Sequence, residues 1–198
     1  KNDAFTLNLL TNVWSPLSST GTAPSARYGH SAIHYTDASG TPLMVIFGGT
    51  DGNNKNDAFA INLLTNVWSP LSSTGAPSAR SHHSAIHYTD ASGTPFMAIF
   101  GGYGGGSSKN DAFTLNLLTN VWSPLSNTET APTPRDGHSA IHYTDASGTP
   151  FMVIFGGHDG SNGLNQPPGL NDAFSLNLLT NVWSPLASTG TAPSPRHG

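Results

Sequence analysis

The residues of this chain best suited to metal binding or acid–base chemistry are its nine histidines. Six of them form two regularly spaced sets: His30, His83 and His138, and, four residues later on the same strand face, His34, His87 and His142. Imidazole ligates metals and titrates near neutral pH, but a zinc site needs several nitrogens within about 2.1 Å of one ion. Carboxylates are sparse around these histidines. We therefore expect them, with neighbouring arginines, to tie connectors to strands by hydrogen bonds, and we predict no metal site.

A second pattern, in residues 51–57, offers oxygen ligands at alternate positions. Asp51, Asn53 and Asn54 resemble the start of a calcium-binding loop. The segment lacks the closing glutamate of such loops and contains Lys55. We interpret the similarity as chance.

Nucleophilic and paired-carboxylate catalysis find no support. The chain has no cysteine and no Gly-x-Ser-x-Gly motif, and its one glutamate, Glu129, stands where the equivalent residue of other repeats is glycine. Four aspartates recur at equivalent positions, and we expect them to cap turns: Asp3, Asp57, Asp111 and Asp172. The sequence predicts no catalytic residue, no cofactor and a non-enzymatic protein.

Composition limits the partners. Only 9% of the 198 residues are charged and the formal net charge is −4, so no basic surface is available for nucleic acid. No apolar run approaches the length that crosses a bilayer, so we expect no membrane insertion. The chain opens at Lys1 without a signal-like segment, which suggests a processed chain or an excerpt of a longer one. The compartment stays undetermined, with an extracellular setting slightly favoured.

The elements that position these residues are tandem repeats. The string Asn-Asp-Ala-Phe begins at Asn2, Asn56, Asn110 and Asn171, with spacings of 54, 54 and 61. Four tryptophans keep the same spacings: Trp14, Trp68, Trp122 and Trp183. The last interval is longer because residues 161–170 form an insertion, which a loop can absorb without disturbing the packing.

One repeat predicts four short antiparallel strands. Residues 31–36 and 43–47 form a hairpin around a turn at 37–42, and the second strand ends at Gly48-Gly49. Residues 58–63 alternate as a third strand, and 67–71 form a fourth, which Pro70 makes an edge strand because proline cannot donate to a ladder. Four strands in about 50 residues, repeated, are typical of a propeller blade.

These motifs resemble the kelch family. The resemblance rests on an apolar strand with a following glycine pair, then an aromatic residue, a tryptophan, and Pro, Arg and His, recurring in order over essentially the whole chain. It implies an all-β array of kelch-type propeller blades whose first strands are innermost around a central channel. The glycine pair would allow close backbone approach, and we expect the tryptophans to fill the cores between blades.

The repeats divide the chain into about 3.5 blades. We expect a half-blade (1–26), three blades (27–79, 80–134 and 135–195) and the start of another (196–198). The missing first two strands of the half-blade exclude closure within these residues. Two hypotheses remain open: a segment of a longer kelch polypeptide, or a half-blade that pairs with another copy as a ring or a filament.

The loops between second and third strands differ most among the near-identical repeats, which is consistent with recognition or simply with surface freedom. They supply the candidate partner-binding residues: Asp51, Asn53, Asn54, Tyr103, Ser107, His158, Asp159, Asn162 and Asn165. The predicted function is a non-catalytic module that binds a protein partner. The alternatives are a building block of an extracellular fibre or surface assembly made of further copies, and a segment of a larger carbohydrate-binding or enzymatic propeller. Ser/Thr/Pro-rich connectors are compatible with O-glycosylation, although plain solvated loops are the simpler interpretation.

Overall fold

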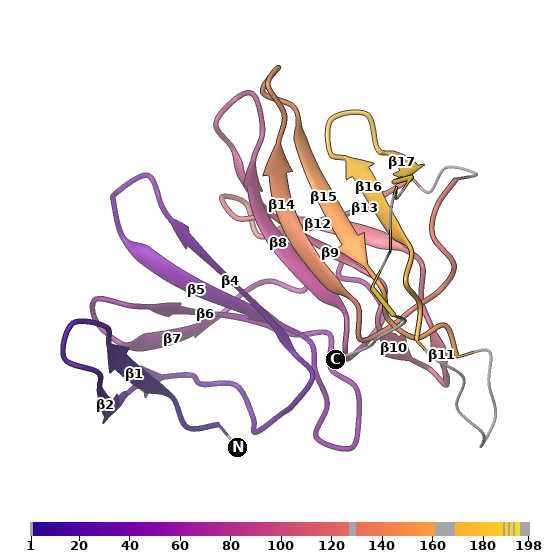
Figure 1. Cartoon of the computed structure of the whole chain (residues 1–198). Coiled ribbons are helices and arrows are strands. Elements are labelled where there is room, and N and C mark those ends of the chain that lie inside the picture. Colours follow the sequence, from indigo (N-terminus) through magenta and orange to yellow (C-terminus); the bar gives the residue numbers. More distant parts are fainter. Residues whose placement is uncertain are drawn as a thin grey trace.

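The protein is an all-β chain in a computed structural model that describes residues 2–126, 130–160, 169–187, 189, 191, 193 and 194. Across these residues the structure contains strands, turns and bends and no helix (Figure 1). No segment of the described part is a helix long and apolar enough to cross a membrane.

Three blades of four antiparallel strands each carry the fold, and one further short strand joins the sheet of the first blade. Blade 1 consists of β4 (Ser31–Thr36), β5 (Pro42–Phe47), β6 (Ala58–Asn62) and β7 (Val67–Pro70). Blade 2 consists of β8 (Ser84–Thr89), β9 (Pro95–Phe100), β12 (Ala112–Asn116) and β13 (Val121–Leu125). Blade 3 consists of β14 (Ser139–Thr144), β15 (Pro150–Phe155), β16 (Ala173–Asn177) and β17 (Val182–Pro185). The half-blade is the separate hairpin of β1 (Phe5–Asn8) and β2 (Val13–Pro16).

Local side chains fix the two turns of every blade. In the turn between the first and second strands, Asp37 Oδ1 accepts hydrogen bonds from the backbone N–H groups of Ser39 and Thr41, both at 2.9 Å. In the turn between the third and fourth strands, Asn62 Oδ1 accepts from Leu64 and Thr65, and Asn66 adopts a φ of 58°. Asparagine tolerates this left-handed conformation, which explains its recurrence there.

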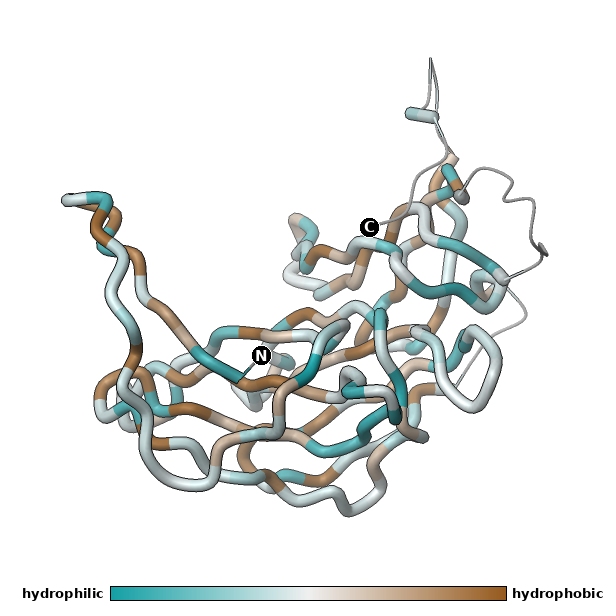
Figure 2. Tube along the Cα trace, turned by 90° about the horizontal axis from the view of Figure 1, so that it is seen from below, coloured by the Kyte–Doolittle hydropathy of each residue, from teal (hydrophilic) through white to brown (hydrophobic). Residues whose placement is uncertain are grey.

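The first strands lie side by side along the inner edge of the array. Strand β8 contacts both β4 and β14, so the three sheets fan outward from a common axis (Figure 1). This arrangement agrees with the prediction that the first strand of each blade is innermost. Hydrophobic residues concentrate along the strands, and the connecting loops are mostly polar (Figure 2).

Tryptophans fill the cores between blades, as the sequence predicts. The ring of Trp122 packs on that of Phe47 with centroids 4.6 Å apart, and Trp183 packs on Phe100 at 4.7 Å. Trp68 is buried on the other face of blade 1, where Leu17 packs against its cluster. Trp14 is the exception, with 65% of its surface exposed, because no blade of the described chain packs against the face of the half-blade on which this ring lies.

The fourth strand is the outermost strand of its blade, but in blade 1 it is not an open edge. The short strand β3 (Thr20–Gly21) runs parallel to β7 and pairs with Val67 and Trp68. The N–H of Thr22 also donates to the Trp68 carbonyl at 3.1 Å. In blade 2 the Trp122 N–H donates to the Thr74 carbonyl at 3.1 Å, and in blade 3 the Thr130 hydroxyl donates to the Trp183 carbonyl. The connector that enters each blade therefore covers its outer edge, an arrangement that the edge-strand prediction missed.

Candidate functional site

A buried arginine at the start of each blade anchors the loops that form one end of the array. Arg80 is fully buried and donates through Nη1 to the Gly101 carbonyl at 3.0 Å. Its two terminal nitrogens contact Asp111 Oδ1 at 2.6 Å and Oδ2 at 2.9 Å, a bidentate pair. The guanidinium also lies 5.6 Å from the centre of the Phe113 ring. Arg27 and Arg135 make the same pattern with Asp57 and Asp172.

This finding corrects the role that the sequence suggested for the aspartates. We expected Asp57, Asp111 and Asp172 to cap turns, but each pairs with the arginine of its own blade. The signal in the sequence was that this aspartate and the arginine each recur at one fixed position of every repeat.

The glycine pairs allow neighbouring backbones to meet, as predicted. Gly101 has a φ of +64°, and a Cβ at that position would lie 2.6 Å from the Arg135 carbonyl oxygen. The N–H of Gly102 donates to the same carbonyl at 2.9 Å. The end of β9 is therefore joined to the start of blade 3 at a separation that a side chain would prevent.

Histidines link one blade to the next. His83 Nε2 and Ser31 Oγ are 2.7 Å apart, and the imidazole meets the edge of Phe47 with centroids 5.3 Å apart. His138 repeats both contacts with Ser84 and Phe100. Burial, reinforced by the nearby Arg80 charge, lowers the pKa of His83 to about 3. Burial and then Arg135 lower the pKa of His138 to about 4. Their role is structural, as expected: each ties the connector of its own blade to the first strand of the preceding blade.

The second set of histidines lies on the inner strands. His34 and His142 are exposed and His87 is half-buried. Burial lowers the pKa of His87, with smaller effects of the His142 and His34 charges. Among the residues that the structure describes, no three histidine, aspartate or glutamate side chains are grouped as metal ligands would be.

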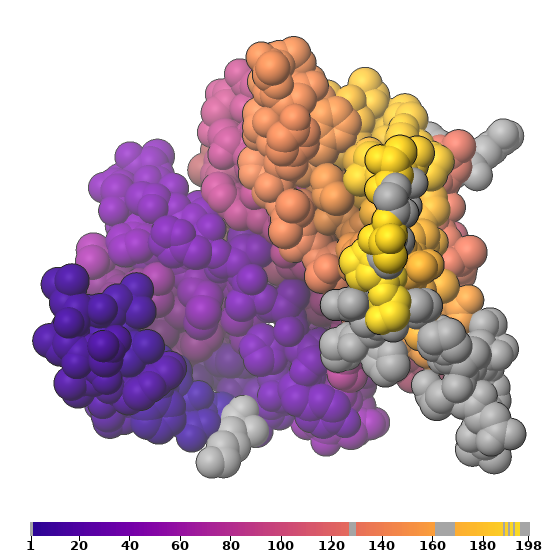
Figure 3. All heavy atoms as spheres, in the orientation of Figure 1, coloured from indigo at the N-terminus to yellow at the C-terminus, as the bar shows by residue number. Residues whose placement is uncertain are grey.

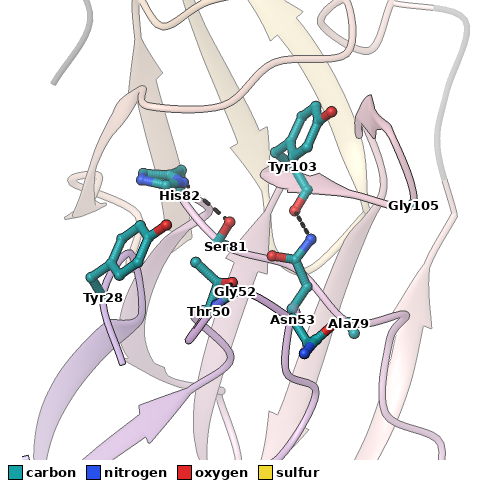
Figure 4. Close-up of a pocket in the computed structure, with 10 residues that line it drawn as sticks. Tyr28, Thr50, Gly52, Asn53, Ala79, Ser81, His82, Tyr103 and Gly105 are labelled. Atoms are coloured by element: carbon teal, nitrogen blue, oxygen red, sulfur yellow. Dashed lines mark hydrogen bonds between the residues drawn. The ribbon is translucent and has the colours of Figure 1, made fainter. Parts of the chain in front are cut away.

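A hollow of about 450 Å³ opens between the loops of blades 1 and 2 (Figure 4). Thr50, Asn53 and Asn54 come from the loop that follows β5. The strand β10 (Tyr103–Gly104), which pairs with β11 (Ser107–Ser108), supplies Tyr103 from the equivalent loop of blade 2. The Nδ2 group of Asn54 donates to the Tyr103 carbonyl at 3.1 Å, which joins the two loops across the blade boundary.

The connectors that precede β4 and β8 complete the hollow with Tyr28, Ser81 and His82. The rings of Tyr28 and His82 lie 6.1 Å apart, edge to face. His82 has a φ of 56°, whereas the equivalent residues of the other two blades are Gly29 and Gly137, both with a φ of 63°. A non-glycine residue in this conformation costs about 1 kcal/mol, and such positions concentrate at functional sites.

Comparison with known proteins agrees with this architecture. The model of the KLHDC2/KLHL20/DRC7 Kelch-repeats domain matches residues 1–198. The chain belongs to the kelch-repeat family. Members of this family are typically protein-interaction modules.

Three curated relatives contain a segment similar to this chain. The chain is 32% identical to Acyl-CoA-binding domain-containing protein 4 of Arabidopsis thaliana, over 95% of this chain and 26% of that protein. It is 31% identical to the Rab9 effector protein with kelch motifs of Bos taurus, over 93% of this chain and 48% of that protein. It is 27% identical to the human Kelch domain-containing protein 3, over 98% of this chain and 50% of that protein. The kelch chain thus spans a quarter to a half of these relatives.

The structure brings three of the predicted partner-binding residues to the hollow, namely Asn53, Asn54 and Tyr103. Asp51 lies on the same loop but pairs with Lys55 at 2.8 Å, and the Lys55 side chain holds the pKa of the Asp51 carboxyl below its usual value. Ser107 belongs to the β10–β11 hairpin.

The remaining candidates belong to blade 3. The backbone of His158 exchanges hydrogen bonds with that of Asp136, and Asp159 follows it. Asn162 and Asn165 lie outside the described residues. Sequence reasoning missed Tyr28, Ser81 and His82. The available signal was His82 itself, a histidine where the other repeats have glycine.

Proposed function

We propose that the hollow between the loops of blades 1 and 2 is the contact site for a protein partner of this kelch chain. The observation that carries the proposal is the left-handed backbone conformation of His82, which lines the hollow at a position where the other two blades have glycine. The packing of the blades gives no reason for the histidine, because blades 1 and 3 have glycine there. A residue kept at a conformational cost on an open hollow is consistent with binding.

The chemistry of the hollow favours an uncharged segment of that partner. Its lining carries two tyrosines, a histidine, two asparagines and small residues, with no lysine, arginine, aspartate or glutamate. Aromatic side chains are enriched where partners bind, because they bury a large area at a low cost in conformational entropy. Asparagine amides add hydrogen bonds to a peptide backbone.

The test compares partner capture by the wild-type chain and two variants. His82→Gly restores the residue of the other repeats and should change the free energy of unfolding by no more than about 1 kcal/mol while reducing capture at least tenfold. Tyr103→Ala should weaken capture similarly. Leu64→Ala, at an exposed turn remote from the hollow, is the control. Because one relative is named a Rab9 effector, Rab9 is a suitable first purified probe, followed by a cell lysate. Equal capture by all four proteins would contradict the proposal.

A second candidate function, a building block that assembles from further copies in an extracellular fibre or layer, is supported by a different observation. The half-blade exposes Trp14, Leu9 and Leu10, and a two-stranded sheet with an open edge and large exposed apolar side chains favours association. Electron microscopy of the concentrated chain distinguishes the two candidates. Fibres or closed particles would support assembly, and single particles of one chain would oppose it.

A further inference from the structure

The outward face of blade 3 is exposed, whereas the equivalent faces of blades 1 and 2 are buried by the blade that follows each of them. On blade 1 the equivalent face is closed by blade 2, so Ile33 is only 7% exposed. The same position in blade 3, Ile141, is 62% exposed, and its neighbour Tyr143 is 51% exposed. Phe155 is half-buried, whereas its equivalents Phe47 and Phe100 are completely buried. This face therefore carries the residues that form one side of an interface between blades, but no blade of the described chain covers it.

The half-blade presents the opposite side of the same interface. Between blades 1 and 2, the covering residues from the third strand, the fourth strand and the turn between them include Leu115, Leu117 and Trp122. Leu7, Leu9 and Trp14 occupy the same repeat positions in the half-blade, since Leu7 pairs with Trp14 as Leu115 pairs with Trp122. Trp122 is 3% exposed, whereas Trp14 is largely exposed.

We propose that the half-blade of one copy docks on the outward face of blade 3 of a second copy, head to tail. The inference rests on the second candidate function, association of the chain with itself, and specifies the surfaces that it would use. Trp14 would pack on Phe155 as Trp122 packs on Phe47. A groove of about 330 Å³ lies on the receiving face, lined by Tyr143, Asp145, Phe151, Val153, Ser175 and Leu186.

The charge distribution permits this contact. Residues 4–26 of the half-blade and its connector carry no charged side chain. Asp145, the one charged residue in the groove, accepts hydrogen bonds from Ser147 and Thr149 of its own turn. The hydrogen bonds within this turn limit the cost of desolvating the Asp145 carboxylate, which is set against the gain from burying apolar area.

The contact is heterologous because it joins two different surfaces, which lie on opposite sides of the molecule. Figure 3 shows the indigo half-blade at one side and the orange strands of blade 3 at the other. Contacts of this kind generate rings or filaments rather than symmetric dimers. The half-blade offers two strands where a blade offers four, because the counterparts of Met97 and Ile99 are not among its strands. The contact should therefore be weaker than an internal blade interface and should depend on concentration.

Sedimentation velocity over a hundredfold range of concentration tests the proposal. Leu9→Lys blocks the half-blade and Tyr143→Lys blocks the receiving face. Both residues are exposed within the chain, so the fold should survive, and circular dichroism checks this. Leu64→Lys, at an exposed turn outside both surfaces, is the matched control.

The expected result is assembly of the wild type and of Leu64→Lys, monomers for each blocked variant alone, and dimers but nothing larger when the two blocked variants are mixed. If the wild type assembles but the mixture stays monomeric, or a blocked variant still assembles like the wild type, the head-to-tail contact is wrong while association survives. A wild type that is monomeric at every concentration overturns both the head-to-tail contact and the association of the chain with itself. The two faces then take an occupant other than a second copy.

Discussion

The imidazole Nε2 of His83 lies 2.7 Å from the hydroxyl of Ser31, and this hydrogen bond joins the first residue of one inner strand to the connector of the next blade. Both side chains are buried. Ser84 and His138 repeat the contact across the second blade interface. The array is therefore held at its inner edge by neutral histidines that have no room for the hydration of a charge.

Stability should fall as the pH decreases from neutrality. The pKa of His83 is about 3 and that of His138 about 4 in the folded chain, against an ordinary value of 6.5. Below pH 6.5 the unfolded chain binds protons that the folded chain does not, so each histidine lowers the free energy of unfolding by about 1.4 kcal/mol per pH unit down to its folded pKa. Urea unfolding at pH 7, 6 and 5 measures the slope.

The contribution of one histidine can be isolated in the same experiment. The variant His83→Gln should reduce the wild-type slope by about 1.4 kcal/mol per pH unit between pH 6.5 and 5. The remaining slope belongs to His138 and to a smaller contribution from His30, His87 and His142, whose pKa values burial also lowers. The turn aspartates Asp37, Asp90 and Asp145 do not interfere, because hydrogen bonds from Ser39, Ser92 and Ser147 respectively, with others in each turn, lower their pKa values below 3.8. An identical slope in the variant and the wild type would show that His83 does not oppose protonation.

Two tryptophans at equivalent repeat positions should differ in their importance for folding. Trp122→Ala removes a buried ring that packs on Phe47 and should lower the free energy of unfolding by about 3–5 kcal/mol. Trp14→Ala, measured on dilute monomer, should lower it by less than about 1 kcal/mol because the ring is exposed. Comparable losses of unfolding free energy in the two variants would mean that the Trp14 ring is buried in solution, contrary to the structure.

The arginine–aspartate pairs give a similar comparison. Asp111→Ala leaves the fully buried Arg80 without its carboxylate, and loss of such a partner costs about 3 kcal/mol. Asp3 is the repeat equivalent in the half-blade, and it is exposed and forms no salt bridge within the described part of the chain. Asp3→Ala should therefore leave the thermal midpoint nearly unchanged. A small effect of Asp111→Ala would indicate that water replaces the carboxylate readily.

Glycine substitutions separate backbone strain from steric contact. Gly93 and Gly101 both have positive φ, so alanine costs about 1–2 kcal/mol at either position. A Cβ at Gly93 would meet nothing within 4 Å, whereas one at Gly101 would lie 2.6 Å from the Arg135 carbonyl. Gly101→Ala should therefore be destabilising by about 1–3 kcal/mol more than Gly93→Ala in chemical denaturation. Equal losses would mean that the junction between blades 2 and 3 can widen freely.

Repetition made the fold predictable. The spacing of Trp68, Trp122 and Trp183 located every blade, and the hairpin and alternation patterns placed most strands within a residue or two of their observed bounds. The inner position of the first strand came from the family resemblance, because spacing alone does not distinguish the two edges of a sheet.

The hollow was only half predicted, for a physical reason. Asn54 and Tyr103 stood out because their loops differ between repeats, but Tyr28 and Ser81 belong to connectors whose approach depends on how the blades pack. The pairing of Arg80 with Asp111 was missed for the same reason, since it joins residues 31 positions apart. Local patterns predict turns well and contacts between distant segments poorly.

Hydrogen exchange of the kelch chain, alone and bound to a partner whose capture depends on His82, tests the central claim most directly. Binding at the hollow should slow exchange in residues 50–54, 81–82 and 103–105, which surround it. Protection confined to the hairpin turns at 37–41, 90–94 and 145–149, at the far end of the blades, would contradict a partner site between the loops of blades 1 and 2.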